Sequence, residues 1–295
     1  MVNPGARGDL AEALGRAEAI AASAGWEASV QRTDMRGHAF ILAGEAAHAG
    51  SDLVVAVGGD GTVREVAAGL AGTGVPLAIV AAGSGNSSYL ELFGSSPWEE
   101  TMGMVLRDFG VRQVDLIELQ PTGEFGLLGF SAGWFAQVVK LAATARSTGA
   151  ARYAEAAGSA AAAPARFAAT VRADGAMLAE GDLGLVAIGG ARVRASVFPV
   201  FPASSMDDGL LEVLTVQATD TAGFNDVLGA VMTGAHLVHP LANYARARRV
   251  EISAPMGMLA EIDGDVWERD LYSVDVACAA GQLTVATTGA RPPAT

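Results

Sequence analysis

Two continuous apolar runs, each closed by a glycine-rich turn, constrain the fold of this sequence more than any other feature. Residues 53–57 read Leu-Val-Val-Ala-Val, and residues 76–82 read Pro-Leu-Ala-Ile-Val-Ala-Ala. Apolar runs without polar alternation are typical of parallel strands, because helices cover such strands on both faces. Apolar residues at helical spacing occur before and between these segments, and we expect helices at 9–24, 38–50 and 63–72. This alternation predicts βαβ units around a parallel sheet.

The pattern changes beyond residue 115. A short additional strand is expected at 26–31, but in the second part strands follow one another with few helices between them. They are expected at 167–172, 183–188, 210–216, 250–253, 258–262 and 283–287. Strands in succession after a βαβ region favour a second, mostly antiparallel domain. We therefore predict an α/β domain over 1–115, a β-rich domain over 116–285 and a C-terminal tail over 286–295.

Charge and cysteine content exclude several classes of protein. The 295 residues carry 19 basic and 32 acidic side chains, a formal net charge of −13. An acidic chain without a basic block is unsuited to sequence-independent nucleic-acid binding, because that binding needs phosphate neutralisation by Lys and Arg. Cys278 is the only cysteine, so no internal disulfide framework exists. The sequence has neither a signal-peptide pattern nor a long uninterrupted apolar run, and we expect a cytoplasmic protein.

The first glycine-rich turn, Gly58-Gly59-Asp60-Gly61-Thr62, follows the apolar run 53–57 directly. Glycines allow backbone N–H groups to approach an anion closely, and the helix that follows offers its positive end to a phosphate. A buried Asp60 carboxylate needs a metal, a hydroxyl or several N–H donors to compensate its lost hydration. The alternative is a tight strand-to-helix turn in which Asp60 and Thr62 serve as caps.

A second turn of the same kind, Gly83-Ser84-Gly85-Asn86, follows the run 76–82. Adjacent parallel strands would place both turns side by side, which favours a nucleotide site over two unrelated structural turns. Neither turn has the pattern G-x-G-x-x-G, and G-x-x-x-x-G-K-[ST] is absent. Lys140 is the only lysine and lies far from both turns, which excludes Walker-type and protein-kinase-type lysine chemistry. Phosphoryl transfer would then depend on backbone amides, Mg²⁺ and arginine, with Arg7 and Arg64 nearest in sequence.

These turns and four further motifs resemble the catalytic domain of the diacylglycerol, sphingosine and ceramide lipid kinase family. Glu65 follows the first turn at the spacing typical of that family. The opening Asn3-Pro4 with Gly8 resembles its first turn, and Thr33 with 37–39 resembles its next nucleotide-contacting segment. Residues 207–211 and 263–265 resemble its two C-terminal Asp-Gly signatures. The resemblance extends over nearly the whole chain.

The resemblance implies a fold and a set of site residues. The expected fold is an N-terminal Rossmann-like nucleotide-binding α/β domain followed by a C-terminal, mostly antiparallel β-sandwich domain. The nucleotide, ATP, would be contacted by Asn3, Thr33, Gly58, Gly59, Asp60, Gly61, Thr62, Arg64, Ser84, Gly85 and Asn86. Asp60 would organise Mg²⁺ and the phosphates. Asp208, with the backbone carbonyls of Ser205 and Leu210, would hold a structural Mg²⁺.

Asp265 would accept the proton of the lipid hydroxyl, with Asp60 as the alternative base. The family pattern carries Glu at that position, so Asp265 reaches one methylene less far. Gln137 replaces an acidic residue of the sphingosine kinases, which favours diacylglycerol or ceramide as the substrate. Read without the family, Asp207-Asp208-Gly209 and Asp263-Gly264-Asp265 are both ordinary hairpin turns, because Asp-Gly is a common turn pair. Before Asn3 only two residues remain of the family's first strand.

The expected activity is ATP-dependent transfer of the γ-phosphoryl group to a lipid hydroxyl. Two alternatives stay open: a kinase of a soluble hydroxylated metabolite on the same fold, similar to NAD kinase, and a catalytically inactive nucleotide-binding sensor. The negative charge argues against stable electrostatic docking on anionic membranes, so we expect transient, apolar contact with the membrane surface. A homodimer is compatible with the sequence, and nucleic acid is not an expected partner.

Overall fold

The computed structural model describes residues 10–147, 149–194, 198–218, 220–267 and 271–289. By its internal contacts the chain divides into two compact units. The first comprises Met1–Val114 together with Gly281–Thr295, and the second comprises Asp115–Ala280. Asn3, Arg7 and the opening Asn-Pro motif lie outside the described residues.

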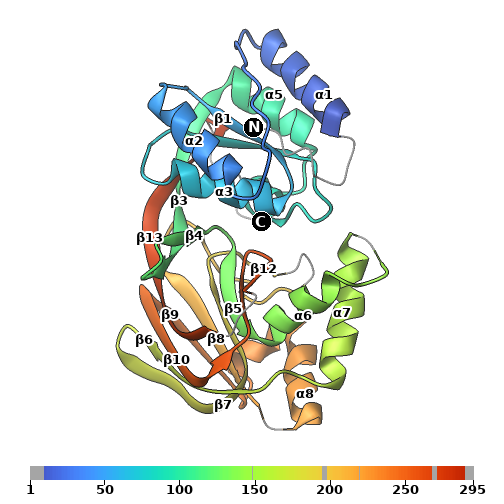
Figure 1. Ribbon diagram of the computed structural model, residues 1–295, viewed down its shortest axis with the longest axis vertical. Coiled ribbons are helices and arrows are strands. Elements are labelled where there is room, and N and C mark those ends of the chain that lie inside the picture. The colour runs from blue at the N-terminus through green and yellow to red at the C-terminus, as the bar shows by residue number, and fades with distance from the viewer. Residues whose placement is uncertain (1–9, 148, 195–197, 219, 268–270, 290–295) are drawn as a thin grey trace. The chain divides into compact units, whose positions relative to one another are not determined.

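The first unit alternates helices with parallel strands (Figure 1). Strand β1 pairs with β2 in parallel, from Val54 opposite Leu77 to Gly58 opposite Ala81. The last part of β13 joins β2 in the same orientation, with Val285 opposite Leu77. The elements of this unit up to residue 107 are α1 (Leu10–Ser23), α2 (His38–His48), β1 (Val54–Gly58), α3 (Asp60–Leu70), β2 (Leu77–Ala81), α4 (Ser87–Phe93) and α5 (Trp98–Arg107).

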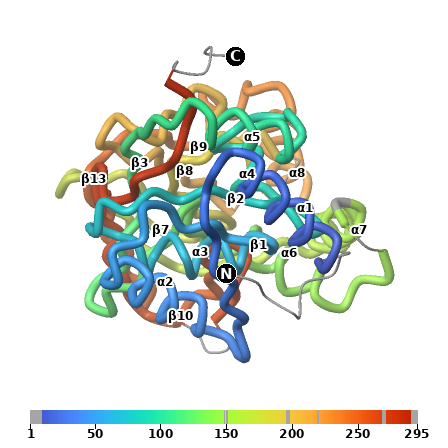
Figure 2. Tube along the Cα trace, turned by 90° about the horizontal axis from the view of Figure 1, so that it is seen from above, coloured from blue at the N-terminus to red at the C-terminus, as the bar shows by residue number. Residues whose placement is uncertain are grey.

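Helices cover both faces of these strands, as the apolar runs predicted. Figure 2 shows α2 and α3 on one side of β1 and β2, and α5 on the other. Val57 and Val80 form a buried cluster with Ala17 and Ala21 of α1 and Met102 of α5. Burial of these apolar side chains stabilises the packing of the helices on both strands by about 25 cal/mol per Å² of area removed from water. This packing fixes the position of the turns at the strand ends.

Two details of the first unit differ from the sequence-based expectation. Helix α3 begins at Asp60 rather than Val63, because an acidic side chain is favourable in a first helical turn. Residues 26–31 form no strand; a single bridge residue occurs at Arg32. An extended segment becomes a strand only when a neighbouring strand completes its ladder, and no described strand pairs with 26–31.

The second unit is a mostly antiparallel β-structure with helices on one side. Its sheet runs β13-β10-β6-β7-β5-β11-β12, with β9 joined to β8 and β8 to β7, and each of these pairings is antiparallel. The strands are β3 (Phe109–Gln120), β4 (Glu124–Gly126), β5 (Gly129–Gly133), β6 (Phe167–Ala173), β7 (Ala176–Gly189), β8 (Leu211–Gln217), β9 (Ala242–Ala247), β10 (Arg249–Met258), β11 (Ala260–Ile262), β12 (Asp265–Val266) and β13 (Leu271–Thr288).

Two apolar clusters make up the core of the second unit. One lies among the strands and includes Phe130, Val186 and Ile252. The other joins the sheet to the helices through Trp134 and Phe224, both almost fully buried. The helical elements are α6 (Trp134–Ala142), α7 (Ala150–Ala162), α8 (Thr221–Val231) and the 3-10 helix η1 (Ala235–Val238). The expected fold class, an α/β unit followed by a mostly antiparallel β-unit, is confirmed. None of the helices within the described ranges is long and apolar enough to cross a membrane.

Candidate functional site

The two glycine-rich turns of the first unit lie against each other. The parallel register brings Gly58 opposite Ala81, and the N–H of Ala82 donates to the carbonyl of Gly58 at 3.0 Å. A Cβ atom at Gly83 would lie only 2.4 Å from the Cα of Gly59. A side chain at Gly83 would therefore overlap the neighbouring main chain. The sequence prediction that the turns meet is correct.

The first turn places a helix N-terminus at the end of β1. Gly59 is extended, with φ −96° and ψ −174°, and α3 begins at the next residue. The first N–H groups of a helix have no partner within it and carry the positive end of its dipole, so an anion is stabilised there. Thr62 lies in this first turn and Arg64 follows it as the fifth residue of α3; both are buried, with 5% and 8% exposure. A cationic side chain is thus held close behind the glycine-rich turn in the sequence.

Asp60 connects the first turn to α4, the helix that follows the second turn. Its Oδ1 accepts a hydrogen bond from the backbone N–H of Ser88 at 2.7 Å, at the start of α4. Ser88 is 1% exposed, so this N–H would lose its partner if the carboxylate were removed. The sequence analysis selected Asp60 as a site residue because of its charge. The structure adds that Asp60 joins the start of α3 to the start of α4 through this hydrogen bond.

The second turn is closed by Asn86. Its side-chain Oδ1 accepts from the N–H of Gly83 at 2.8 Å, and its Nδ2 donates to the carbonyl of Gly83 at 3.0 Å. Asn86 itself adopts the left-handed region, with φ 53°, which Asn tolerates better than most residues. Both ends of its amide are therefore engaged within the turn. Ser84 is exposed at the tip, where it is open to a ligand.

Glu65 joins a third segment to this region. Its Oε1 accepts from the N–H of Gly37 at 2.8 Å, and its Oε2 accepts from the N–H of Ala39 at 3.2 Å. Gly37 has φ 82°, a conformation that glycine adopts at little cost. Thr33, 5% exposed, precedes this junction. The Glu65 carboxylate thereby holds the start of α2 on α3.

In the second unit, Asp263 and Gly264 form the two-residue turn of the β11–β12 hairpin. Ile262 lies opposite Asp265, and both turn residues have positive φ, at 49° and 88°. Such a pair is typical of a tight hairpin turn with Asp-Gly. The hairpin interpretation of this motif is thus correct. It does not exclude a role for Asp265, which begins β12 and is half-buried.

The two carboxylates of this motif have different environments. Asp263 accepts three backbone hydrogen bonds, from the N–H groups of Leu127 at 2.6 Å, Leu128 at 2.9 Å and Gly129 at 2.8 Å. Asp263 therefore fixes the hairpin on the start of β5. Asp265, at the start of β12, is half-buried and takes part in none of these three bonds.

A buried ion pair lies behind the hairpin, and sequence reasoning missed it. Arg194 Nη2 lies 2.5 Å from Glu261 Oε1, and the two side chains are 6% and 1% exposed. Ser131 Oγ also hydrogen-bonds to this carboxylate, and its Oε2 accepts from the N–H of Gly264 at 2.8 Å. Arg194 and Glu261 are 67 residues apart and belong to no local motif, so their pairing left no signal in the sequence.

The loop before β8 carries the predicted metal ligands and is not a hairpin turn. Asp208 Oδ1 accepts from the N–H of Leu210 at 3.0 Å, while its Oδ2 pairs with Arg246. The second carboxylate at this loop, Asp115, accepts from the N–H of Gly209 at 2.7 Å. The Asp-Asp-Gly sequence thus belongs to a loop that leads into β8, and the carboxylates of Asp115 and Asp208 hold this loop by hydrogen bonds to its backbone. Residues 207–209 lie near the end of the long connection 190–210 between the paired strands β7 and β8, so they do not form the tight two-residue turn of a hairpin.

Two side chains near this loop, Cys278 and Tyr244, have raised pKa values. Burial raises the pKa of Cys278 to about 12, and the nearby charges of Asp115 and Asp208 act in the same direction. Burial also raises the pKa of Tyr244, whose hydroxyl hydrogen-bonds to Glu212. Glu212 accepts in turn from Arg246 Nε at 3.1 Å. Arg246 is thus the cation shared between Asp208 and Glu212.

The residues at this loop fit a divalent cation only with main-chain help. No cluster of three His, Cys, Asp or Glu side chains suited to a metal occurs among the described residues. Each oxygen of Asp208 has two lone pairs, of which the described hydrogen bonds and ion pair occupy one each. Asp208 therefore retains acceptor capacity, and the carbonyls of Ser205 and Leu210 would have to supply the remaining protein ligands.

Comparison with known proteins agrees with these sites. Residues 1–119 match the diacylglycerol kinase catalytic domain, and residues 129–287 match the YegS C-terminal NAD kinase beta sandwich-like domain. A Pseudomonas aeruginosa protein named as a YegS-like lipid kinase is 32% identical over 270 residues, which cover 87% of this chain and 84% of the relative. A Mycobacterium tuberculosis diacylglycerol kinase is 27% identical over 223 residues, 73% of this chain and 71% of that protein.

Solved structures share the fold. A diacylglycerol kinase from Bacillus anthracis superposes with a TM-score of 0.73 at 21% identity, covering 98% of this chain and 95% of that one. An NAD kinase from Archaeoglobus fulgidus in complex with ATP gives 0.54 at 13% identity, covering 94% and 90%.

The paired glycine turns, the β-unit and the matched relatives define a kinase class, a phosphotransferase with an alcohol group as acceptor. Within that class, the chain belongs to the family of YegS-like lipid kinases and diacylglycerol kinases.

Proposed function

We propose that this protein transfers the γ-phosphoryl group of ATP to a hydroxyl group of a lipid such as diacylglycerol or ceramide. The observation that supports it best is the contact between the glycine turns at Gly59 and Gly83. Two turns that meet at glycines, next to the N-terminus of α3, form a concentration of backbone N–H groups suited to phosphates. The family relationship supports the lipid as acceptor.

In this proposal the nucleotide is bound mainly by main-chain groups. The N–H groups of Gly58 to Thr62 and of Ser84 and Gly85 would approach the phosphates, while Arg64 supplies positive charge. Thr33 lies at the segment that Glu65 anchors to α3 and would contact the nucleotide from there. Asn86 acts through the turn that it closes, since its amide already bonds to Gly83 at both ends.

Two carboxylates are candidates for removing the proton of the lipid hydroxyl. Asp265 is proposed as the base because its neighbour Asp263 is committed to three backbone donors. Asp60 is proposed to position the phosphates and to serve as the alternative base. Phosphoryl transfer depends chiefly on positioning and on charge neutralisation. Either carboxylate would therefore act by accepting the proton of the lipid hydroxyl from a fixed position.

Mg²⁺ is the expected cofactor. Where bound with the phosphates, it would neutralise charge that develops during transfer. Asp60 would hold the catalytic ion, and Asp208 with the carbonyls of Ser205 and Leu210 would hold a structural one. Asp208 has lone pairs left for this role, as described above.

Contact with the lipid phase is proposed to be apolar and transient. Met35, Phe40 and Ile41, around the start of α2, are 74%, 49% and 54% exposed. Three exposed large apolar side chains within seven residues form a surface that can enter a lipid interface. The net charge of −13 opposes stable binding to an anionic bilayer.

The test is ADP release in mixed micelles that contain diacylglycerol, ceramide or sphingosine, with ATP and Mg²⁺. Turnover with a lipid hydroxyl, abolished in Asp60→Ala and lowered at least about 100-fold in Asp265→Asn, is the expected result. Turnover of a soluble hydroxyl compound without micelles would instead indicate the soluble-metabolite kinase. Nucleotide-induced thermal stabilisation without any turnover would indicate the inactive sensor.

A further inference from the structure

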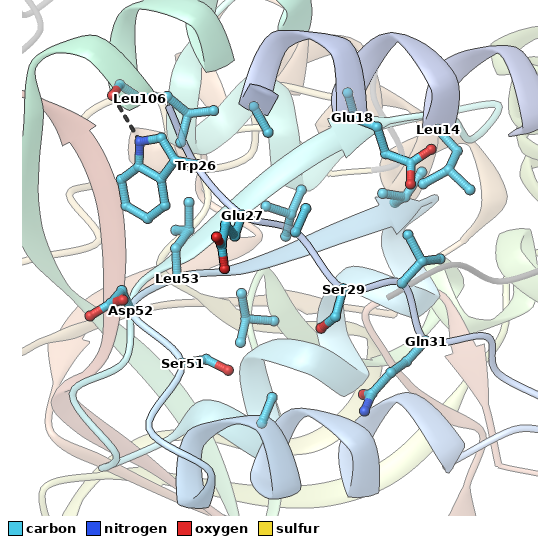
Figure 3. A pocket seen from close by; sticks show the side chains of 18 of the residues that line it. Leu14, Glu18, Trp26, Glu27, Ser29, Gln31, Ser51, Asp52, Leu53 and Leu106 are labelled. Carbon is cyan, nitrogen blue, oxygen red and sulfur yellow. Dashed lines mark hydrogen bonds between the residues drawn. The ribbon is translucent and has the colours of Figure 1, made fainter. Parts of the chain in front are cut away.

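The two units hold acidic side chains in very different surroundings. A cavity of about 440 Å³ in the first unit carries Glu18, Glu27 and Asp52 on its walls (Figure 3), and all three residues are exposed. Water compensates the charge of such carboxylates. In the second unit, Glu261 of β11 is only 1% exposed. A carboxylate buried to this extent must be compensated by the protein, so its partners show what it holds in place.

The two oxygens of the Glu261 carboxylate have different partners. Oε1 lies 2.5 Å from Nη2 of Arg194 and also accepts the hydroxyl of Ser131, the residue opposite Glu261 on β5. Oε2 accepts the backbone N–H of Gly264 at 2.8 Å. One oxygen is therefore bound to the buried counter-charge, while the other is bound to the main chain of the β11–β12 hairpin turn.

The fold makes room for the counter-charge. A Cβ atom on Gly129, at the start of β5, would overlap Nη1 of Arg194 and lie 2.6 Å from the carbonyl oxygen of Ile188, and glycine avoids both contacts. The backbone of Arg194 is fixed as well. Its N–H donates to the carbonyl of Phe198 at 2.8 Å, and its carbonyl accepts from the N–H of Phe198 at 2.9 Å. The guanidinium is thus held at one place from both ends.

The stability of the fold does not by itself account for this ion pair. Removing two charged groups from water costs about as much free energy as their attraction returns, and a well-packed apolar pair of similar volume is often at least as stable. Arg194→Met with Glu261→Met would fill much of the same volume without a buried charge. This replacement would lose the acceptor of the Gly264 N–H. The bond to the hairpin turn is therefore the specific contribution of Glu261.

The bond at Gly264 lies next to the carboxylate that is proposed as the base. Asp265 follows Gly264 directly and begins β12. Gly264 has φ 88°, and a rotation at this glycine would swing the Asp265 side chain to another place. Asp263 holds the turn on the N–H groups of 127–129. Glu261 supplies a second restraint, one residue before Asp265.

From these contacts we propose that Glu261 is a positioning residue for Asp265, and that Arg194 is the buried counter-charge that compensates it. Through the N–H of Gly264, Glu261 sets the direction in which the Asp265 carboxylate points. A misplacement of about 1 Å can lower turnover on the order of 100-fold, so one hydrogen bond at this turn has a measurable effect. The inference rests on the proposed function in one respect, the role of Asp265 as the base.

Two double variants that differ in one side chain test the positioning role. Arg194→Met with Glu261→Met removes both charges and the bond to Gly264. Arg194→Met with Glu261→Gln also removes both charges but keeps an amide oxygen for that N–H. In mixed micelles with ATP and Mg²⁺, the first variant should lower kcat at least about tenfold and leave KM for ATP within about twofold of wild type. The second should recover kcat to within about threefold of wild type.

Ile252→Val is the control for an unspecific loss of stability. Ile252 is buried in the same unit and lies on β10, which pairs with β6 and β13 and not with the hairpin. The substitution leaves a small cavity and should lower Tm in calorimetry. Its kcat should stay within about twofold of wild type, because it does not touch the turn that carries Asp265.

Hydrogen exchange followed by NMR gives a readout that needs no turnover. The Gly264 amide should exchange at least about tenfold faster in Arg194→Met with Glu261→Met than in the wild type, because it has lost its acceptor. The amide of Trp267 is the internal reference. It donates to the carbonyl of Ala260 at 3.0 Å beside the same hairpin and should keep its exchange rate.

The outcomes separate this inference from the proposed function. An active wild type whose kcat is unchanged in Arg194→Met with Glu261→Met would overturn the positioning role. An equal loss of kcat in both double variants would overturn it as well, because the bond to Gly264 would then make no difference. Absence of lipid turnover in the wild type would refute the proposed function instead. Unchanged exchange at Gly264 would in that case show that Glu261 does not hold the turn.

Discussion

The Cα atom of Gly59 and the position of a Cβ on Gly83 are separated by 2.4 Å, which is closer than Cβ atoms approach the non-bonded heavy atoms of other residues in proteins. Gly83→Ala must therefore displace one of the two turns. Overpacking of this kind costs about 1–3 kcal/mol. We expect a lower Tm in calorimetry and a weaker nucleotide-dependent thermal shift.

Gly61→Ala is the matched stability control for that substitution. Gly61 lies in α3 with nothing within 4 Å of a Cβ, and its φ is not positive. Replacing glycine by alanine within a helix is favourable by roughly 0.5–1 kcal/mol. An equal loss of Tm in both variants would show that the close approach of the turns does not explain the requirement for glycine.

Asp60 has two proposed roles that amide and alanine substitutions separate. Asp60→Asn keeps an oxygen acceptor for the Ser88 N–H but removes the charge, so folding should be near wild type and turnover at least about 100-fold lower. Asp60→Ala also leaves that N–H unpaired, at a further cost of about 1–3 kcal/mol in stability. Wild-type turnover in Asp60→Asn would reduce Asp60 to a structural residue.

The Arg194–Glu261 pair should be far more sensitive to single than to double substitution. Glu261→Met and Arg194→Met each leave one buried charge without its partner, and we expect each to lower the free energy of unfolding by about 3–5 kcal/mol. Arg194→Met combined with Glu261→Met removes both charges and should recover a large part of this loss. Additive effects in urea titrations would indicate that the pair is not coupled.

The raised pKa of Cys278 predicts that the protein loses stability at alkaline pH. Its pKa is raised to about 12 in the folded protein, chiefly by burial, against about 8.5 in an unfolded chain. The unfolded thiol therefore loses its proton first, and the contribution of Cys278 to stability is complete below about pH 8.5 and falls as the pH rises towards 12.

Thermal unfolding between pH 8 and 11 measures this effect. The difference in Tm between wild type and Cys278→Ala should change with pH in the direction that disfavours the wild type. The folded thiol should also react with iodoacetamide at pH 8 at least about tenfold more slowly than the unfolded one. A pH-independent difference in Tm would contradict the raised pKa.

The apolar surface at the start of α2 predicts a defect that depends on the lipid phase. Phe40→Ser with Ile41→Ser changes two exposed side chains and should alter stability by about 0.5 kcal/mol or less per site. Turnover on vesicle-embedded lipid should fall about tenfold, while the nucleotide-dependent thermal shift stays unchanged. Met104→Ser, 47% exposed on α5, is the control and should retain turnover.

The sequence predicted best those elements whose pattern reports a fully buried environment. The runs at 53–57 and 76–82 became β1 and β2, because strands covered on both faces require continuous apolar residues. The contact of their turns followed from the parallel arrangement alone. Gly59 and Gly83 were thus placed together without any information on tertiary structure.

Features that depend on distant residues were predicted poorly or not at all. Segment 26–31 has the composition of a strand but lacks a described neighbour, and composition cannot report whether a neighbour exists. The pairing of Arg194 with Glu261 depends on the third dimension in the same way. The loop at Asp208 was open to two interpretations, and the length of the connection 190–210 between β7 and β8 decides against a tight hairpin turn. The carboxylate that holds this loop, Asp115, is 94 residues from Gly209.

Strand β13 gives the protein an order of assembly during its synthesis. The sheet of the first unit receives Val285 beside Leu77, so the described strand next to β2 on that side comes from a much later part of the chain. Translation of the intervening residues 115–280 takes on the order of ten to thirty seconds at about 5–20 residues per second. For that interval the outer edge of β2 stands exposed on the ribosome-bound chain. Until residues 281–288 have been synthesised, this edge of β2 therefore lacks the strand that pairs with it in the folded protein.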